Sequence, residues 1–313
     1  MKIVFFGTSP FAAQILTFLL SQTIEVLAVV TRPDRPRGRS QQLSSPPVKE
    51  TLLQLRPDIP VHQPEKASTP EFAAILSSYD ADLFVVVAYG EIIKQNILDI
   101  PQWGCINIHA SLLPKYRGAA PIQRSLFAGD LVTGITIIDM VLKMDAGDML
   151  GTAQVAVPPS MTCGELEEKL IAASCPLLLN ILHDFEKGTV KRIPQDPEGV
   201  TFAQKITPED EKIYWTEPAA DLHNRIRALS PAPGAWCRVW VGAEEKRLKI
   251  KRSAPVLTKS GTPGEILVFD AKEGLQVACG QGALALLEVQ LEGKKTMSIE
   301  DFIKGIRSSI SFN

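Results

Sequence analysis

The first two thirds of the chain alternate short apolar runs with longer segments of helical period. The runs are rich in Val, Ile, Leu and Phe, and they fall at residues 3–6, 26–30, 83–87, 105–108 and 135–140. Continuous apolar runs of this length predict strands buried on both faces, and intervening helices indicate parallel pairing. We therefore expect an α/β fold with a doubly wound, mostly parallel, Rossmann-like sheet.

The expected helices begin with local start signals. A Ser-Pro pair opens a helix over residues 9–20, and a Thr-Pro-Glu sequence at 69–71 opens another. Thr162 and Glu165 have the spacing of a capping box, which predicts a long helix that closes the first domain.

The pattern changes beyond that long helix. Residues 186–218 contain four prolines, as is typical of a linker. A short helix over 219–229 is followed by five short strands with glycine turns and by a last helix after Ser298. This order favours a small OB-like β-barrel. We predict two domains, 1–203 and 204–313.

Composition indicates an ordinary globular protein. The 313 residues include 33 Lys and Arg against 35 Asp and Glu, so a wholly basic nucleic-acid coat protein is excluded. The five cysteines form no C-x-x-C pair, and we expect neither a disulfide framework nor a metal site. No run approaches the roughly 18 apolar residues of a membrane span. A polar turn at residues 7–10 interrupts any signal-peptide core, so a cytoplasmic location without membrane contact is expected.

The stretch 104–118 holds the strongest chemical signal. Side chains alternate along a strand, so Asn107 and His109 project to the same side. An amide can donate to a developing oxyanion, and an imidazole with an ordinary pKa of about 6.5 can exchange a proton at neutral pH. This pair suits acyl transfer, although satisfied polar core residues would have the same pattern.

A carboxylate would complete the set by orienting or charging the imidazole. Asp145 lies in a glycine-containing loop after the 135–140 run and is the strongest candidate, with Asp139 and Asp148 as weaker rivals. No G-x-S-x-G nucleophile elbow occurs, which favours direct attack by the substrate over a covalent enzyme intermediate.

These residues carry a resemblance to a known family. The motifs N-x-H-x-S-L-L-P, Y-R-G-A-A-P and M-D-x-G-D resemble those of the 10-formyltetrahydrofolate-dependent formyltransferases, and they stand at residues 107–114, 116–121 and 144–148. Further matching stretches are spread over nearly the whole chain, at residues 7–12, 203–206, 215 and 225–236.

The resemblance implies a binding site for 10-formyltetrahydrofolate as cosubstrate. Its implied lining comprises two stretches, Ser111, Leu112, Leu113 and Pro114, and Ala88, Tyr89, Gly90 and Ile92. In the implied reaction an amine attacks the formyl carbon and Asn107 donates to the oxyanion. His109 and Asp145 then manage the charge and the proton transfers.

The segment 31–49 contains five basic residues and one acidic residue and has almost no apolar content. Its composition alone predicts a solvated loop. Within the family, the chain is most similar to members that formylate methionyl initiator tRNA. Those members carry a basic insertion here, so the resemblance implies tRNA contacts by four arginines, Arg32, Arg35, Arg37 and Arg39.

A second basic group lies on one expected strand of the C-terminal domain and includes Lys246, Arg247 and Lys249. These residues could belong to an edge strand whose lysines prevent pairing with other chains, or they could form a binding surface for tRNA phosphates. We expect a monomer.

Other functions remain open at this point. Related enzymes could formylate an amino sugar or a glycinamide ribonucleotide, or hydrolyse formyl-folate, and the same fold could serve only as a folate- or RNA-binding module. The basic segment and the second domain favour tRNA, and the three polar groups argue against a module without catalysis.

Overall fold

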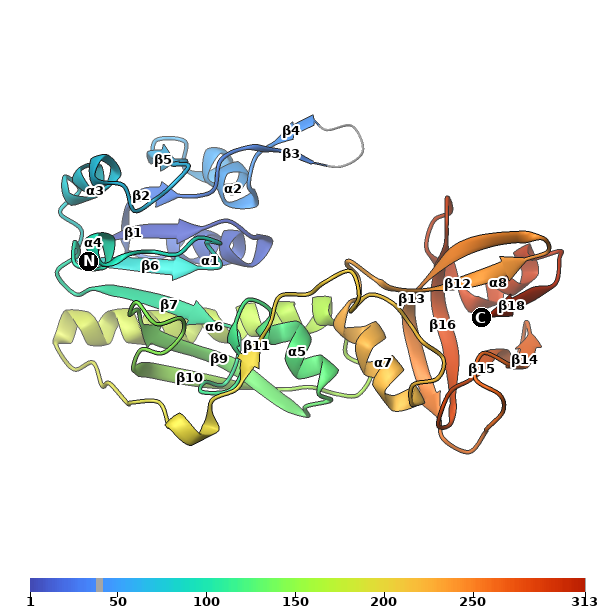
Figure 1. Ribbon diagram of the computed structural model, residues 1–313. Helices are drawn as coiled ribbons and strands as arrows, with labels where there is room; N and C mark the ends of the chain where they lie inside the picture. Colours follow the sequence, from blue (N-terminus) through green and yellow to red (C-terminus); the bar gives the residue numbers. More distant parts are fainter. Residues whose placement is uncertain (38–41, 313) are drawn as a thin grey trace. The chain divides into compact units, whose positions relative to one another are not determined.

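The structure is a computed structural model that describes residues 1–37 and 42–312, and it divides into two compact units (Figure 1). The first unit comprises residues 1–118, 133–155 and 167–202, and the second comprises the intervening segments 119–132 and 156–166 together with the chain from residue 203 onward. The second unit thus takes in two earlier segments. The predicted division at 203 and 204 stays a prediction.

A seven-stranded sheet forms the centre of the first unit. Its strands lie in the order β10-β9-β7-β6-β1-β2-β5. They are β1 (Lys2–Gly7), β2 (Glu25–Val30), β5 (Val61–His62), β6 (Leu83–Val87), β7 (Cys105–His109), β9 (Val132–Asp139) and β10 (Met149–Ala156). The pairs from β5 through β2, β1 and β6 to β7 are parallel, and β9 runs antiparallel to β7. The predicted doubly wound, mostly parallel sheet is confirmed.

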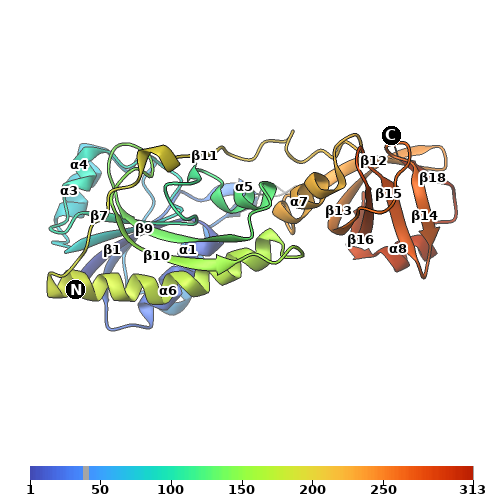
Figure 2. The same cartoon turned by 90° about the horizontal axis from the view of Figure 1, so that it is seen from below.

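Helices cover both faces of this sheet. Those of the first unit are α1 (Pro10–Leu20), α2 (Pro47–Leu55), α3 (Pro70–Ser77), α4 (Gln95–Leu98) and most of α6 (Cys163–Lys187). The helix α5 (Pro121–Phe127) belongs to the second unit. Alternate strand residues such as Phe6 and Phe84 pack with Leu76 of α3 and Ile97 of α4. Figure 2 shows α6 along the opposite face.

The predicted helix starts are confirmed by their hydrogen bonds. Ser9 Oγ accepts from Ala12 N–H at 3.2 Å at the start of α1. Thr162 N–H donates to Glu165 Oε2 at 2.8 Å, and Glu165 N–H donates back to Thr162 Oγ1 at 3.4 Å, which completes the capping box.

The second unit contains a nearly closed, barrel-like antiparallel sheet in the order β14-β15-β16-β13-β12-β18, with β17 paired to β16. Its strands are β12 (Ala235–Val241), β13 (Glu244–Val256), β14 (Ile266–Asp270), β15 (Gly274–Ala278), β16 (Ala283–Leu291), β17 (Met297–Ser298) and β18 (Ile310–Phe312). The helices α7 (Ala219–Ala228) and α8 (Ile299–Gly305) contribute to its core. The expected small β-barrel is confirmed.

Two differences from the sequence predictions concern short or charged strands. The basic segment forms a hairpin of β3 (Arg35–Arg37) and β4 (Gln42–Ser44), in which Arg35 pairs with Ser44. β13 has 13 residues and is much longer than the short strands expected in this domain, because its charged half also pairs with β12. Hydrogen bonds to a neighbouring strand form the β3–β4 hairpin and the charged half of β13. Such pairing needs no run of apolar residues, so the sequence pattern does not reveal it.

A second pair of short strands and a turn of 3-10 helix also lie outside the main sheets. β8 (Arg117–Gly118) pairs with β11 (Phe202–Ala203), and the 3-10 turn spans Pro197–Gly199. Within the described ranges, no helix is long and apolar enough to cross a membrane.

His223 of α7 connects three segments of the second unit. Its Nε2 lies 2.9 Å from the carbonyl oxygen of Pro159, and its Nδ1 lies 3.1 Å from Ser253 Oγ. Burial lowers the pKa of His223, because the charged imidazole loses its hydration, and Arg227 acts in the same direction.

This lowered pKa predicts weaker folding in acid. The unfolded chain takes up a proton near pH 6.5, roughly the ordinary pKa, while folded His223 resists it, so the free energy of unfolding falls as the pH drops below that value. We expect His223→Gln to reduce the fall in urea midpoint between about pH 7 and pH 5.5. The pKa values of His62 and His109 are also lowered, so part of the fall in urea midpoint should remain in His223→Gln. The exposed His183→Gln is the control, and an unchanged fall in His223→Gln contradicts the prediction.

Candidate active site

Asn107 and His109 lie at the carboxyl end of β7, in the interior of the sheet. β7 is flanked by β6 and β9, and Asn107 is paired with Val86 on one side and Ile138 on the other. Both polar side chains reach the same acidic residue, which confirms that they share one side of the strand. Open α/β sheets place ligand sites beyond this edge.

Asp145 is that acidic residue. Its Oδ1 accepts from Asn107 Nδ2 at 3.3 Å, and its Oδ2 lies 3.6 Å from His109 Nδ1. The backbone N–H of Gly118 donates to the same Oδ2 at 2.8 Å. Asn107 and His109 therefore meet the distant carboxylate that was predicted for them, and the Gly118 N–H, which was not predicted, joins them there.

The backbone of the Asp145 loop is unusual. Asp145 itself has φ +50°, a left-handed conformation that is uncommon for a residue with a side chain. At Gly147 an added Cβ would stand 1.7 Å from the carbonyl oxygen of Asp139, so only glycine allows this approach. The loop is thus held against the end of β9.

Among the described residues, Asp145 is the carboxylate that contacts both Asn107 and His109. Asp139 Oδ2 accepts from Arg192 Nε at 2.6 Å, and burial raises the pKa of Asp139. Asp148 is bonded to Asp139 through its main-chain carbonyl oxygen, which accepts from Asp139 N–H at 2.9 Å, and its negative charge also raises the pKa of Asp139. The contacts therefore favour Asp145 among the three candidates.

The hydrogen bonds of His109 determine which nitrogen carries its proton. Nε2 lies 2.9 Å from the carbonyl oxygen of Tyr116, which can only accept, so Nε2 must donate. In the neutral ring Nδ1 then holds the lone pair, and it is Nδ1 that faces Asp145. The side chain is 5% exposed, and burial lowers the pKa of His109, while the Asp145 carboxylate opposes that shift. His109 is thus a neutral base beside an anion that stabilises its protonated form.

The predicted cosubstrate stretch at 88–92 follows β6, next to the end of β7. Ala88 and Gly90 both have positive φ, and Gly90 has open space around it. Tyr89 is 2% exposed, and its hydroxyl has no hydrogen-bond partner among the described residues. Ile92 is 70% exposed. The turn therefore presents main-chain groups and an exposed apolar side chain at this edge.

The second predicted stretch, 111–114, is more firmly built into the protein. Ser111 Oγ donates to the carbonyl oxygen of Lys115 at 2.6 Å, and Leu113 N–H donates to Thr136 Oγ1 at 3.0 Å. Ser111 and Leu113 are buried, whereas Leu112 and Pro114 are partly exposed. Only the latter two offer side-chain surface to a ligand.

The arginines of the basic segment have different environments. Arg32 Nη1 donates to Glu91 Oε2 at 2.8 Å, so Arg32 connects β2 to the turn at 88–92. Arg35 is 57% exposed and pairs with Glu65. Arg37 is in β3, and Arg39 lies outside the described residues.

The strand register divides the basic residues of β13. Leu248 and Ile250 are fully buried, so Arg247, Lys249 and Lys251 share the outer side. The Arg247 guanidinium lies 4.0 Å from the ring centre of Trp236, and Lys249 Nζ donates to the carbonyl oxygen of Pro233 at 2.7 Å.

Lys246 lies on the other side of β13 and pairs with Glu244. The outer cations Lys249 and Lys251 contact neutral carbonyl groups, of Pro233 and Pro231, which do not neutralise their positive charge. Glu288 is near enough to act on the charge of Lys251. We call Trp236, Arg247, Lys249 and Lys251 the outer basic face.

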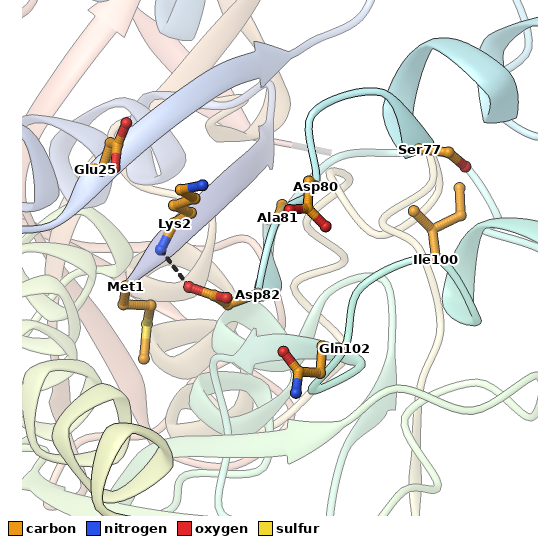
Figure 3. Close-up of a pocket in the computed structure, with 9 residues that line it drawn as sticks. All are labelled: Met1, Lys2, Glu25, Ser77, Asp80, Ala81, Asp82, Ile100 and Gln102. Atoms are coloured by element: carbon orange, nitrogen blue, oxygen red, sulfur yellow. Dashed lines mark hydrogen bonds between the residues drawn. The ribbon is translucent and has the colours of Figure 1, made fainter.

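A hollow of about 420 Å³ lies at the opposite edge of the sheet (Figure 3). It includes Lys2 and Asp82, which precede or begin β1 and β6, and the Lys2 backbone N–H donates to Asp82 Oδ2 at 2.6 Å. The candidate residues follow the strand ends, so this hollow is separate from them. In the part of the chain that the structure describes, no group of three or more His, Cys, Asp or Glu residues could hold a metal ion.

Comparison with known proteins identifies the family. Residues 1–182 match the formyl transferase family model, and residues 205–307 match the model of the formyl transferase C-terminal domain. The chain therefore belongs to the formyl transferase family.

Curated relatives match along almost the whole chain. The methionyl-tRNA formyltransferase of Protochlamydia amoebophila is 51% identical over 306 residues, which cover 98% of this chain and 95% of that protein. The methionyl-tRNA formyltransferase of Chlamydia muridarum is 46% identical, with 99% and 98% covered.

Solved structures of more distant proteins share the fold. HypX from Aquifex aeolicus in complex with tetrahydrofolic acid aligns with a TM-score of 0.66 and 16% identity, over 99% of this chain and 48% of that one. The sugar 3N-formyl transferase WlaRD aligns with a TM-score of 0.67 and 18% identity, over 94% and 99%. At such identities the likeness concerns the fold alone.

The approach of Gly147 to Asp139 gives a stability prediction. Gly147→Ala forces the Asp145 loop away from β9, and we expect the free energy of unfolding to fall by about 1–3 kcal/mol. Urea titration measures this change. Gly305→Ala is the matched control, because nothing lies within 4 Å of its added Cβ. Equal stability of the two variants would refute the account of this loop.

Proposed function

We propose that this protein transfers the formyl group of 10-formyltetrahydrofolate to the α-amino group of methionyl initiator tRNA. The convergence of Asn107 and His109 on Asp145 supports the chemistry. The choice of substrate is supported by the near full-length similarity to proteins named methionyl-tRNA formyltransferase.

His109 serves as the base in this proposal. The amine loses a proton as it bonds to the formyl carbon, and His109 Nδ1 is the ring nitrogen with a lone pair to receive it. Asp145, 3.6 Å away, stabilises the imidazolium that results. The proton then passes to the folate nitrogen as the bond from that nitrogen to the formyl carbon breaks.

Asn107 stabilises the oxygen of the reacting formyl group. One N–H of its amide points at Asp145, and the amide carries a second donor for a formyl oxygen that gains negative charge. The Asp145 contact orients the amide before the substrate arrives, so no reorganisation is needed during the reaction.

The folate cosubstrate fits the edge formed by residues 88–92 and 111–114. Bound 10-formyltetrahydrofolate supplies a formyl group on nitrogen, which a primary amine can displace. The positive-φ turn at Ala88 and Gly90 exposes main-chain donors and acceptors suited to a planar polar ring. Ile92, Leu112 and Pro114 offer apolar surface, and the buried Tyr89 hydroxyl is a polar group that still lacks a partner in the described residues.

The tRNA contacts in this proposal lie in both basic regions. Arg35 on the β3–β4 hairpin is exposed, and the lysines of the outer basic face contact neutral carbonyl groups, so both regions can offer positive charge to phosphates. Arg32, which is paired with Glu91, more directly supports the turn at 88–92. Contacts by Arg37, Arg39 and Lys246 stay predictions, as do a monomeric state and a cytoplasmic location.

The reaction can be tested with labelled formyl donor. The parent chain should transfer label from 10-formyltetrahydrofolate to charged initiator tRNA, and not to free methionine, an amino-sugar nucleotide or water. Asn107→Ala should lower kcat about 10²- to 10³-fold, because it removes an oxyanion donor, while folate affinity changes little. Asn96→Ala, an exposed asparagine of α4, is the control. Near-normal turnover in the Asn107 variant removes this residue from the mechanism.

The outer basic face predicts a salt-dependent affinity for tRNA. Each phosphate contact contributes roughly 0.7 to 0.9 to the slope of log K against log salt. Replacing Lys249 and Lys251 together by Ala should therefore weaken tRNA binding and lower that slope by about 1 to 2. Lys304→Ala on α8, where Lys304 pairs with Glu300, should leave the slope unchanged. An unaltered slope in the double variant would exclude this face from the tRNA site.

A further inference from the structure

Gln195 lies between Arg117 and the Asp145 loop and was not identified from the sequence. Arg117 is 6% exposed, and its Nε and Nη2 both donate to Gln195 Oε1, at 3.0 and 2.7 Å. At the other end of the same amide, Nε2 donates to the carbonyl oxygens of Asp145 and Gly147, both at 2.8 Å.

The chemistry of the partners fixes the orientation of this amide. A guanidinium can only donate and a backbone carbonyl can only accept, so the oxygen of Gln195 must face Arg117 and the nitrogen must face the loop. Both amide hydrogens and the amide oxygen are used. Among neutral and acidic side chains of this length, only glutamine satisfies both ends.

The chain that follows Gln195 also supports the other side of the site. Thr201 accepts on its Oγ1 from Tyr116 N–H at 2.8 Å and on its carbonyl oxygen from Arg117 N–H at 2.9 Å. The Tyr116 carbonyl in turn accepts from His109 Nε2. The segment 195–201 therefore contacts both the loop that carries Asp145 and the turn that orients His109.

We propose that Gln195 is a positioning residue for formyl transfer. Anchored by Arg117, it fixes the main chain at Asp145 and Gly147, so that the carboxylate stays between Asn107 and His109. This inference rests on the proposed function and on the role of Asp145 in it.

A purely structural role is the competing explanation. Gln195 would then serve only to satisfy the buried guanidinium of Arg117, which is costly to leave without an acceptor. Two substitutions separate the roles. Gln195→Glu keeps, and strengthens, the acceptor for Arg117 but turns an oxygen atom, in place of the amide nitrogen, toward the carbonyl oxygens of Asp145 and Gly147. Gln195→Met removes both ends without adding charge.

We expect both Gln195 variants to lower kcat for formyl transfer by about 10- to 100-fold, the scale of a small misplacement of a catalytic group. The KM values for folate and tRNA should stay close to those of the parent chain, because neither substrate contacts Gln195 in the proposal. Gln195→Glu should lower the thermal midpoint less than Gln195→Met does, because it keeps the acceptor for the buried Arg117. The matched control is Gln102→Glu, an exposed glutamine at the opposite edge of the sheet.

The pH profile supplies a readout that a structural role would not move. His109 faces the Asp145 carboxylate, the Arg117 guanidinium and the Tyr116 carbonyl. Displacing the carboxylate removes the contact that favours the protonated ring, so the acidic limb of kcat in Gln195→Met should move to lower pH. An unmoved limb contradicts the proposal.

Normal kcat in Gln195→Glu would overturn the inference, since only the Arg117 contact would then matter. Asp145→Asn separates this failure from failure of the proposed function. If Asp145→Asn is inactive while Gln195→Glu is normal, only the Gln195 inference is wrong. If Asp145→Asn keeps full activity, both are wrong. A parent chain that does not formylate charged tRNA overturns the proposed function directly.

Discussion

The carboxylate of Asp145 is the point on which the polar centre of the first unit depends. Its Oδ1 holds the amide of Asn107, and its Oδ2 receives the Gly118 N–H and lies near His109 Nδ1. A carboxylate in this position is possible only because the backbone at Asp145 is left-handed and Gly147 packs directly on β9. The chemistry of the site is therefore a consequence of the path of one loop.

Part of this site could be predicted from sequence, because part of it depends on local periodicity. Alternation along a strand places Asn107 and His109 on one side, and a loop after the next strand suggests Asp145. The other groups that hold Asp145 and His109 in place have no recognisable pattern in the sequence. The Gly118 N–H and the Tyr116 carbonyl belong to the main chain, and Gln195 is 50 residues from Asp145.

The same distinction applies to the fold. The starts of α1 and α6 were predictable because Ser9 and the Thr162–Glu165 pair act within one helical turn. The β3–β4 hairpin and the charged half of β13 are made by pairing with another strand, which composition alone does not reveal. Which cations face outward on β13 also became clear only from the burial of Leu248 and Ile250.

The state of the His109 ring gives the most direct test of the account. In ¹⁵N NMR spectra of the labelled full-length chain near neutral pH, we expect Nε2 to carry the proton and Nδ1 to be the nitrogen that titrates. In Asp145→Asn the pKa of the ring should be lower than in the parent chain, since the neighbouring anion is lost. A ring protonated at Nδ1 in its neutral form, or a pKa unaffected by Asp145→Asn, would contradict the arrangement.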